Sequence, residues 1–332
     1  MRIALVGATG VVGESMIKLL EEHGFGDCEF FPAASERSLG KKLMFGGREH
    51  TVGSLADAVE WKADVALFSA GGAVSKEWAP RFAEKGTRVV DNSSAWRMEP
   101  NIPLIVPEVN PDAVGKEDYI IANPNCSTIQ LMLAIAPIER EVGISHMHVS
   151  TYQSVTGSGM KGIRQLECER EGRDLELAPA YAYRIDQNVV PQCDDFLDNG
   201  YTKEEMKLVN ETRKILDAPG MMVSATAVRV PVKGGHSEAV SIVCKQPCSP
   251  AKVRELLANK PGLVLQDNPD GREYPMPYYA FGRDEVFVGR VREDLAYPGT
   301  GVNMWVVADN IRKGAATNAV QIIELLQEKG II

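Results

Sequence analysis

The feature that most constrains the fold of this chain is a glycine-rich turn close to its N-terminus. A short apolar run at 3–6 is followed by GATGVVG at 7–13 and then by an amphipathic segment at 13–23. Glycine permits a tight turn and lets backbone N–H groups approach a pyrophosphate at the N-terminus of a helix. Because this turn joins a strand to a helix, it predicts a dinucleotide-binding unit.

The first third of the chain continues to alternate strands and helices. Such alternation is typical of an α/β fold with a doubly wound (Rossmann-type) parallel sheet, whose ligands bind at the carboxyl ends of the strands. Further strands are predicted at 29–33, 65–69, 87–91 and 119–122, with a helix at 75–84.

The pattern changes after residue 126, where a mixed α+β domain with a mostly antiparallel sheet is predicted. The amphipathic segment at 315–329 is expected to pack back on the first domain. We therefore predict a dinucleotide-binding domain of residues 1–125 and 313–332, and a second domain of residues 126–312. The predicted helices of the second domain are 127–141, 164–171 and 203–216, and its predicted strands are 146–154, 223–232 and 239–243.

Composition limits the kinds of partner. Asp and Glu number 45 against 36 Lys and Arg, which gives the 332 residues a formal net charge of −9. This balance argues against nucleic acid or an anionic membrane as the main partner. No apolar stretch has the length of a membrane helix or of a signal-peptide core. The six scattered cysteines form no CxxC pair, as expected of a reduced protein, so we expect a cytoplasmic location and a small-molecule ligand.

The loop after the second predicted strand bears on the choice between NAD and NADP. In this loop Arg37 can pair with a 2′-phosphate and Ser38 can donate to it, which favours NADP. Glu36 would instead suit the ribose hydroxyls of NAD, and the loop could also be a solvated surface, so these residues leave the choice open. The cofactor contacts predicted in this domain are Gly7, Thr9, Gly10, Val11, Val12, Gly13, Ser35, Arg37, Ser38, Ser69 and Gly71.

Cys126 is the most conspicuous candidate for catalysis. Most single cysteines are small core residues, but this one follows a strand and a proline-containing turn and opens a helix. Backbone N–H groups and the helix dipole at such a position lower the pKa of a thiol and can stabilise an oxyanion. A cysteine nucleophile beside a nicotinamide indicates aldehyde chemistry through a thioester.

Three of the five histidines call for an interpretation. His236 is flanked by glycines, and an imidazole has a pKa suited to proton transfer. His146 and His148 share one face of a predicted strand and could hold a metal ion. No third ligand is evident for them, so we interpret them as ordinary strand residues and predict no metal site.

Six motifs, in order along the whole chain, resemble those of the aspartate-semialdehyde dehydrogenase family. They are GATGVVG at 7–13, SSAWR at 93–97, NPNCST at 123–128, QSVTG at 153–157, RVPVKGGH at 229–236 and DNIRKGA at 309–315.

The resemblance implies a function and a role for each matching residue. Cys126 would be the nucleophile, His236 the general acid/base, and Gln153 would orient the substrate at the thioester. The reaction would be the NADP-dependent reductive dephosphorylation of 4-phospho-L-aspartate to L-aspartate 4-semialdehyde, in lysine, threonine and methionine biosynthesis. The protein would be a homodimer, or a tetramer. Substrate or phosphate would be bound by Arg97, Asn125, Glu204, Lys207 and Arg229, and the cofactor also by Thr156, Gly157 and Asn310.

Spacing alone allows other interpretations. Glu204 and Lys207 could form an ordinary surface i,i+3 salt bridge. An N-acetyl-gamma-glutamyl-phosphate reductase would use the same mechanism, although Asn125 and Glu204 favour aspartate. A dehydrogenase of the glyceraldehyde-3-phosphate type would have other motifs. A non-catalytic Rossmann regulatory protein would be expected to lack Cys126 or His236, and both are present.

Overall fold

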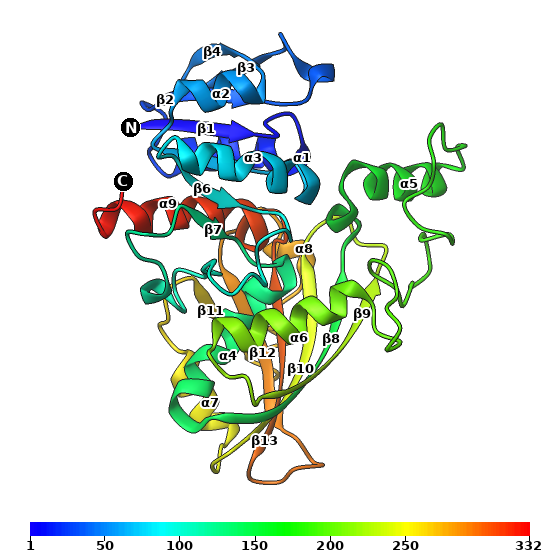
Figure 1. Cartoon of the computed structure of the whole chain (residues 1–332). Helices are drawn as coiled ribbons and strands as arrows, with labels where there is room; N and C mark the ends of the chain where they lie inside the picture. The colour runs from blue at the N-terminus through cyan, green and yellow to red at the C-terminus, as the bar shows by residue number, and fades with distance from the viewer. The chain divides into compact units, whose positions relative to one another are not determined.

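Two main β-sheets organise the 332 residues, all of which the computed structural model describes (Figure 1). Each sheet belongs to one of two compact units: residues 1–125 with 315–332, and residues 126–314. None of the helices has both the length and the apolar character of a membrane-spanning helix.

The sheet of the first unit is parallel throughout, with the strand order β2-β1-β5-β6-β7. Most residues of its central strands are buried, as expected when helices cover both faces of a sheet. A separate hairpin is formed by β3 (Lys42–Phe45) and β4 (Arg48–Thr51). The sheet strands are β1 (Arg2–Val6), β2 (Glu29–Ala33), β5 (Val65–Phe68), β6 (Arg88–Asp91) and β7 (Ile120–Ala122).

Helices on the two faces of this sheet confirm the predicted doubly wound fold. In one core, Met16 of α1 (Val11–Glu22) packs with Ile322 of α9 (Asn318–Glu328). The C-terminal helix therefore belongs to the first unit and follows a π-helical turn at Arg312–Thr317. The other core includes residues of α2 (Leu55–Trp61) and α3 (Gly72–Glu84).

The sheet of the second unit is mixed but mostly antiparallel, as predicted, since three of its five strand pairs are antiparallel. Its order is β11-β12-β13-β10-β8-β9, and the pairs β8–β9 and β11–β12 are parallel. The predicted strand at 223–232 ends at Arg229, because Pro231 has no N–H for a ladder hydrogen bond. The strands are β8 (Ile144–Gln153), β9 (Met222–Arg229), β10 (His236–Cys244), β11 (Leu263–Leu265), β12 (Val286–Glu293) and β13 (Gly301–Ala308).

The longer helices cover one face of this sheet (Figure 1). On the other face the short α8 (Pro277–Ala280) packs over β12 and β13, and β8 and β9 are left uncovered. Along β8, Val149 and Thr151 are buried beneath the helices, whereas His148 and Tyr152 are exposed on the other face. His146 also points to this uncovered face, because its side chain has the same strand parity. The helices of the unit are α4 (Cys126–Val142), α5 (Gly159–Glu171), α6 (Lys203–Ile215), α7 (Pro250–Leu257) and the short α8 (Pro277–Ala280).

Candidate active site

The glycine turn owes its shape to two close backbone approaches. Gly7 has a φ of +88°, and a Cβ atom on it would lie 2.4 Å from the carbonyl oxygen of Ser69. A Cβ atom on Gly13 would lie 2.2 Å from the carbonyl oxygen of Gly7. Neither position accommodates a side chain. The turn leads into α1, whose N-terminus has no side-chain cap and so presents backbone N–H groups that suit a phosphate.

A cavity of about 600 Å³ opens beside this turn. Thr9 Oγ1 lies 3.2 Å from Ser38 Oγ, which connects the glycine turn to the loop after β2. Glu36 lines the cavity, whereas the exposed Arg37 does not. The volume of the cavity and its mixture of apolar walls with a few polar groups suit a nucleotide. The lining residues are Val6, Gly7, Thr9, Gly10, Ala34, Ser35, Glu36, Leu39, Ser54, Leu55, Ala56, Ser69, Ala70, Val74 and Trp78.

The remaining predicted cofactor residues of this unit lie next to the cavity in the chain. Val11, Val12 and Gly13 form the first turn of α1, and Gly71 precedes α3. The apolar wall of Leu39, Leu55, Val74 and Trp78 was not predicted, because nothing in a local pattern distinguishes such residues from an ordinary core.

Arg97 and Asn125 follow β6 and β7 at the edge of the sheet where folds of this kind bind ligands. Both residues are buried. Arg97 donates from Nε to the carbonyl oxygen of Asn123 at 2.9 Å and from Nη2 to that of Asn92 at 3.0 Å. These bonds fix the guanidinium group at the carboxyl edge of the sheet.

Cys126 is the first residue of α4 in the second unit. A helix N-terminus carries backbone N–H groups and the positive end of the helix dipole, which favour a thiolate and an oxyanion. The residue is partly exposed, and Gly314 lies against it. A Cβ atom on Gly314 would be 2.9 Å from the Cβ of Cys126, so glycine at this position leaves room around the thiol.

His236 is completely buried at the start of β10. Its Nδ1 accepts a hydrogen bond of 3.1 Å from the backbone N–H of Ser154. Because a backbone N–H can only donate, the neutral ring carries its proton on Nε2. Burial, together with the positive charge of Arg229, lowers the pKa of His236 to about 3. The imidazole is therefore neutral at physiological pH.

Ser154 joins His236 to a cluster that contains two of the predicted cofactor residues. Its hydroxyl lies 3.1 Å from His236 Nδ1 and donates to Asn310 Oδ1 at 3.0 Å. Asn310 Oδ1 also accepts from Thr156 Oγ1 at 3.0 Å and from the backbone N–H of Gly235 at 3.1 Å. The loop before His236 and the segment after β8 are thus held together by one amide oxygen.

Gly157 lies directly against the buried side chains. A Cβ atom on Gly157 would be 2.6 Å from Arg229 Nη1 and 3.2 Å from His236 Nε2. Any side chain at this position would displace one of them. The structure therefore gives Gly157 a steric role next to the two side chains, whichever part of the ligand approaches there.

Gln153 begins a chain of polar and charged contacts. From the end of β8 its Nε2 donates to Glu204 Oε1 at 3.0 Å and to Ser127 Oγ at 3.1 Å. Glu204 pairs with Lys207 at 3.0 Å, and Lys207 also contacts Asp194 at 2.9 Å. Burial alone would lower the pKa of Lys207, but the carboxylates of Glu204 and Asp194 outweigh it and raise the pKa to about 12. Because Glu204 is buried, this is not an ordinary surface salt bridge.

Arg229 ends β9 beside a smaller cavity of about 230 Å³. Its Nη1 donates to the carbonyl oxygen of Ser154 at 2.8 Å, and the ring of Tyr181 lies 5.9 Å from its guanidinium carbon. The buried Nε has no hydrogen-bond partner in the protein. The cavity lining is Ser158, Ala180, Tyr181, Ala182, Tyr183, Val190, Gln192, Cys193, Asp194, Asp195 and Arg229.

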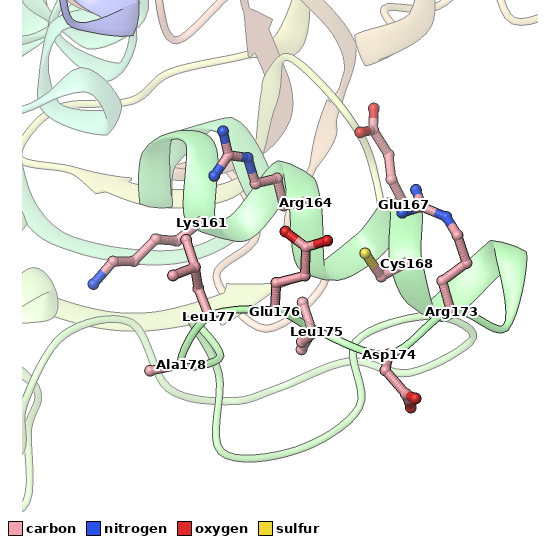
Figure 2. A pocket seen from close by; sticks show the side chains of 10 residues that line it. All are labelled: Lys161, Arg164, Glu167, Cys168, Arg173, Asp174, Leu175, Glu176, Leu177 and Ala178. Atoms are coloured by element: carbon pink, nitrogen blue, oxygen red, sulfur yellow. The ribbon is translucent and has the colours of Figure 1, made fainter.

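A third cavity, of about 390 Å³, lies between α5 and the chain that follows it (Figure 2). Its walls mix cations such as Lys161 and Arg164 with anions such as Glu167 and Glu176. None of the predicted site residues lines it. The cavity beside Arg229 is therefore the one that adjoins the candidate catalytic cluster.

Four residues that help to build this site were not predicted individually. Ser154 and Gly314 stood within recognised motifs, but only the fold shows that they contact His236 and Cys126. Asp194 and Tyr181 lie in a long irregular segment and reach the site through contacts distant in sequence. Asp194 adopts a φ of 69°, which is uncommon for a residue other than glycine and is frequent at functional sites.

The two units match two domains of one family. Residues 2–117 match the semialdehyde dehydrogenase NAD-binding domain, and residues 135–313 match the semialdehyde dehydrogenase dimerisation domain. The fold and the site therefore define an oxidoreductase of the semialdehyde dehydrogenase class, which uses a nicotinamide cofactor.

Individual relatives narrow this class and confirm the resemblance noted from the motifs. The aspartate-semialdehyde dehydrogenase of Aquifex aeolicus is 53% identical over 338 residues, which cover 100% of this chain and 99% of the relative. The crystal structure of aspartate semialdehyde dehydrogenase II from Vibrio cholerae complexed with ASA is 46% identical with a TM-score of 0.93, and 98% of each chain is covered. That of the Candida albicans enzyme with NADP is 28% identical, with a TM-score of 0.80 and coverage of 100% and 99%. The chain belongs to the aspartate-semialdehyde dehydrogenase family.

Proposed function

We propose that this chain converts 4-phospho-L-aspartate and NADPH to L-aspartate 4-semialdehyde, phosphate and NADP⁺. The observation that carries the proposal is the arrangement of buried charged groups in the second unit. An α-amino acid needs an anion for its ammonium group and a cation for its carboxylate. Glu204 and Arg229 supply these two charges, and both side chains are buried and fixed by hydrogen bonds.

Cys126 is the proposed nucleophile. Its thiolate attacks the acyl carbon, a carbon–sulfur bond forms, and phosphate leaves with the electrons of the carbon–oxygen bond. The nicotinamide cofactor, when bound, supplies the hydride that reduces the thioester. Cleavage of the carbon–sulfur bond then releases the aldehyde and regenerates the thiolate.

His236 is the proposed proton donor and acceptor. The Ser154 amide fixes the tautomer in which Nε2 carries the proton, so a neutral His236 can donate a hydrogen bond or a proton to the substrate oxygen. Gln153 would orient the substrate at the thioester, since its amide is held by Glu204 and Ser127.

Two cations are proposed to bind phosphate. Lys207 keeps its charge because its pKa is raised to about 12, and Arg97 provides a guanidinium plane that suits phosphate. Asn125, which precedes the nucleophile, completes the proposed substrate set. Thr156, Gly157 and Asn310 are proposed to meet the cofactor near His236.

NADP is the proposed cofactor. The cavity beside the glycine turn accommodates a nucleotide, and a Cβ atom on either Gly7 or Gly13 would disrupt the turn. In the adjoining loop Arg37 and Ser38 can receive a 2′-phosphate, whereas Glu36 would favour the ribose of NAD. The NADP-containing structure of the Candida albicans relative supports NADP.

A homodimer is the proposed assembly, formed through the uncovered face of the second sheet. Tyr152 on β8 and Met222 on β9 are 38% and 58% exposed there, which is unusual for large apolar side chains on a regular sheet. The match to a dimerisation domain supports this assignment. Sedimentation of the wild type and of Tyr152→Glu would test it, with a monomeric wild type as the contradicting result.

The reaction is tested by phosphate-dependent formation of NADPH from L-aspartate 4-semialdehyde, with N-acetylglutamate semialdehyde assayed in parallel. The expected signal requires aspartate semialdehyde and disappears without phosphate. Activity only with the acetylated aldehyde would keep the mechanism but change the substrate. Inactivity with both, despite bound cofactor, would contradict the proposed function.

Cofactor choice is tested by Arg37→Ala. If Arg37 binds the 2′-phosphate, KM for NADP should rise about tenfold while KM for NAD is unchanged. Arg48→Ala removes a solvent-exposed arginine on β4, which does not line the cavity, and serves as the control. An equal rise in KM for both cofactors would show that Arg37 does not read the phosphate.

A further inference from the structure

Glu238 is a buried carboxyl group to which no part of the proposed mechanism assigns a role. Its exposure is 0%, and neither side-chain oxygen has a hydrogen-bond partner. A buried acceptor without a donor is destabilising, and an unpaired buried charge is more so. A carboxyl group in such a place therefore needs an explanation.

Its position links Glu238 to the catalytic histidine. Glu238 and His236 are two residues apart on β10, so their side chains point to the same face of the sheet. Both are buried on the face that α4 covers, since Gln130 of α4 donates a long hydrogen bond of 3.5 Å to the carbonyl oxygen of His236. The carboxyl group thus lies beneath the helix that also carries the nucleophile.

Gln130 is the polar neighbour of Glu238 on that helix. Gln130 follows Cys126 by four residues, which places both on one side of α4. Its side chain is fully buried, and its Oε1 also has no donor. Two side chains with unpaired acceptors therefore meet between the helix of the nucleophile and the strand of the histidine.

A proton on the Glu238 carboxyl group would give these unpaired acceptors a donor. A neutral carboxylic acid can donate its O–H to Gln130 Oε1 and accept from the Gln130 amide with its other oxygen. Burial raises the pKa of Glu238 well above its ordinary value, and the only side chain that opposes this shift is the neighbouring Gln130. No charged group contributes to the shift, so nothing around Glu238 stabilises the ionised form.

We propose that Glu238, as a neutral acid paired with Gln130, is a positioning residue that holds the strand of His236 in register with the helix of Cys126. Gln130 lies about one helical turn after Cys126 on α4. Glu238 is the next residue after His236 whose side chain lies on the same face of β10. A small relative shift of two catalytic groups can cost about a hundredfold in rate, which gives such a link functional weight. The inference rests on the proposed roles of Cys126 and His236.

The test uses the full-length protein and separates positioning from folding. Glu238→Leu and Gln130→Met each break the pair, and we expect kcat to fall about tenfold to a hundredfold while KM stays within about twofold. Glu238→Gln reproduces the neutral acid and should keep kcat within about threefold, as should the exchanged pair Gln130→Glu/Glu238→Gln. Val240→Ala perturbs the next residue on the same face of β10 and controls for lost packing. Thermal unfolding is recorded for every variant.

Two results would overturn the proposal. Wild-type kcat in a folded Glu238→Leu or Gln130→Met variant would overturn the proposal. A loss in Glu238→Gln as large as in Glu238→Leu would also overturn it, since it would show that the ionised carboxylate is needed. If Glu238→Leu does not fold, Gln130→Met and the exchanged pair still decide. Cys126→Ala, assayed alongside, reveals separately whether the proposed nucleophile is wrong.

Discussion

The two units of this chain hold their functional groups in opposite ways. In the first unit the glycine turn acts through main-chain atoms, and the loop beside its cavity leaves Ser35, Glu36 and Arg37 exposed. In the second unit the proposed site consists largely of side chains, and Gln153, Arg229 and His236 are all buried. Each is held by hydrogen bonds, Arg229 and His236 to the backbone of Ser154 and Gln153 to neighbouring side chains.

This difference determines which changes each unit tolerates. A site made of backbone N–H groups is indifferent to most side chains but fails when a Cβ atom enters a close approach. A buried site of linked side chains depends on each member, because removal of one leaves its partner unsatisfied in a medium of low polarity. The first unit should therefore be sensitive at its glycines, and the second at its polar residues.

Substitution of the nucleophile should give the largest effect and separates the two units most sharply. Cys126→Ala is expected to lower turnover at least about 10⁴-fold, as expected when a covalent nucleophile is lost, while the first unit still binds NADPH. Turnover is followed by NADPH formation and binding by quenching of protein fluorescence. Loss of cofactor binding together with activity would show that Cys126 has a structural role. It would contradict the view that the two units hold their functional groups separately.

The same difference explains what the sequence could predict. The glycine spacing of 7–13 is a local pattern, and the parallel sheet that it predicts is confirmed. Cys126 was identified as a candidate because a strand, a turn and a helix start are also local features. The contacts of Ser154 with His236 and of Asp194 with Lys207 join distant segments, so no local pattern carries them.

Strand pairing in the second unit shows the same limit. The alternation in β8 and β9 predicts two half-buried strands, but their parallel pairing follows from the connection through α5 and α6. The β-branched and aromatic residues of β13 would have supported a strand prediction, and β13 was nevertheless missed. Its antiparallel place between β10 and β12 could not be predicted from its composition.

In the first unit, a glycine substitution should affect both stability and cofactor binding. Gly13→Ala forces a Cβ atom to within 2.2 Å of the Gly7 carbonyl oxygen, so we expect a loss of about 1–3 kcal/mol of stability and at least about tenfold weaker NADPH binding. Gly220→Ala is the control, because nothing lies within 4 Å of a Cβ atom there. Cofactor titration and thermal unfolding give the readouts. Unchanged binding in Gly13→Ala would mean that the turn does not determine the site.

Acid should affect the second unit through His236. Its folded pKa of about 3 lies below the ordinary 6.5, so the unfolded chain binds a proton that the folded one excludes. Stability is therefore fully present above about pH 6.5 and falls as the pH drops towards 3, by at most about 1.4 kcal/mol per pH unit. Glu238 changes stability in the opposite direction, because its raised pKa makes the folded state lose stability as the pH rises above its ordinary 4.5.

Comparison with His236→Asn isolates the histidine, since Glu238 is present in both proteins. Denaturant unfolding at several pH values between 4 and 7 should show a smaller loss of stability towards acid in the variant than in the wild type. Parallel pH profiles for the two proteins would show that His236 can be protonated without unfolding and would contradict its burial.

A small effect is expected at the partly exposed edge of the site in the second unit. There each side chain should contribute less than in the buried cluster. Lys207 and Asp194 are 24% and 35% exposed, so their contact is screened by solvent. In Asp194→Asn the lysine remains charged at neutral pH, because its pKa falls from a raised value, and we expect KM for phosphate to change by only about twofold to fivefold. Lys203→Ala breaks the neighbouring exposed pair with Asp195 and should change nothing. A hundredfold change in KM for phosphate in Asp194→Asn would contradict this expectation. It would show that the exposed residues of the site depend on one another as strongly as the buried ones.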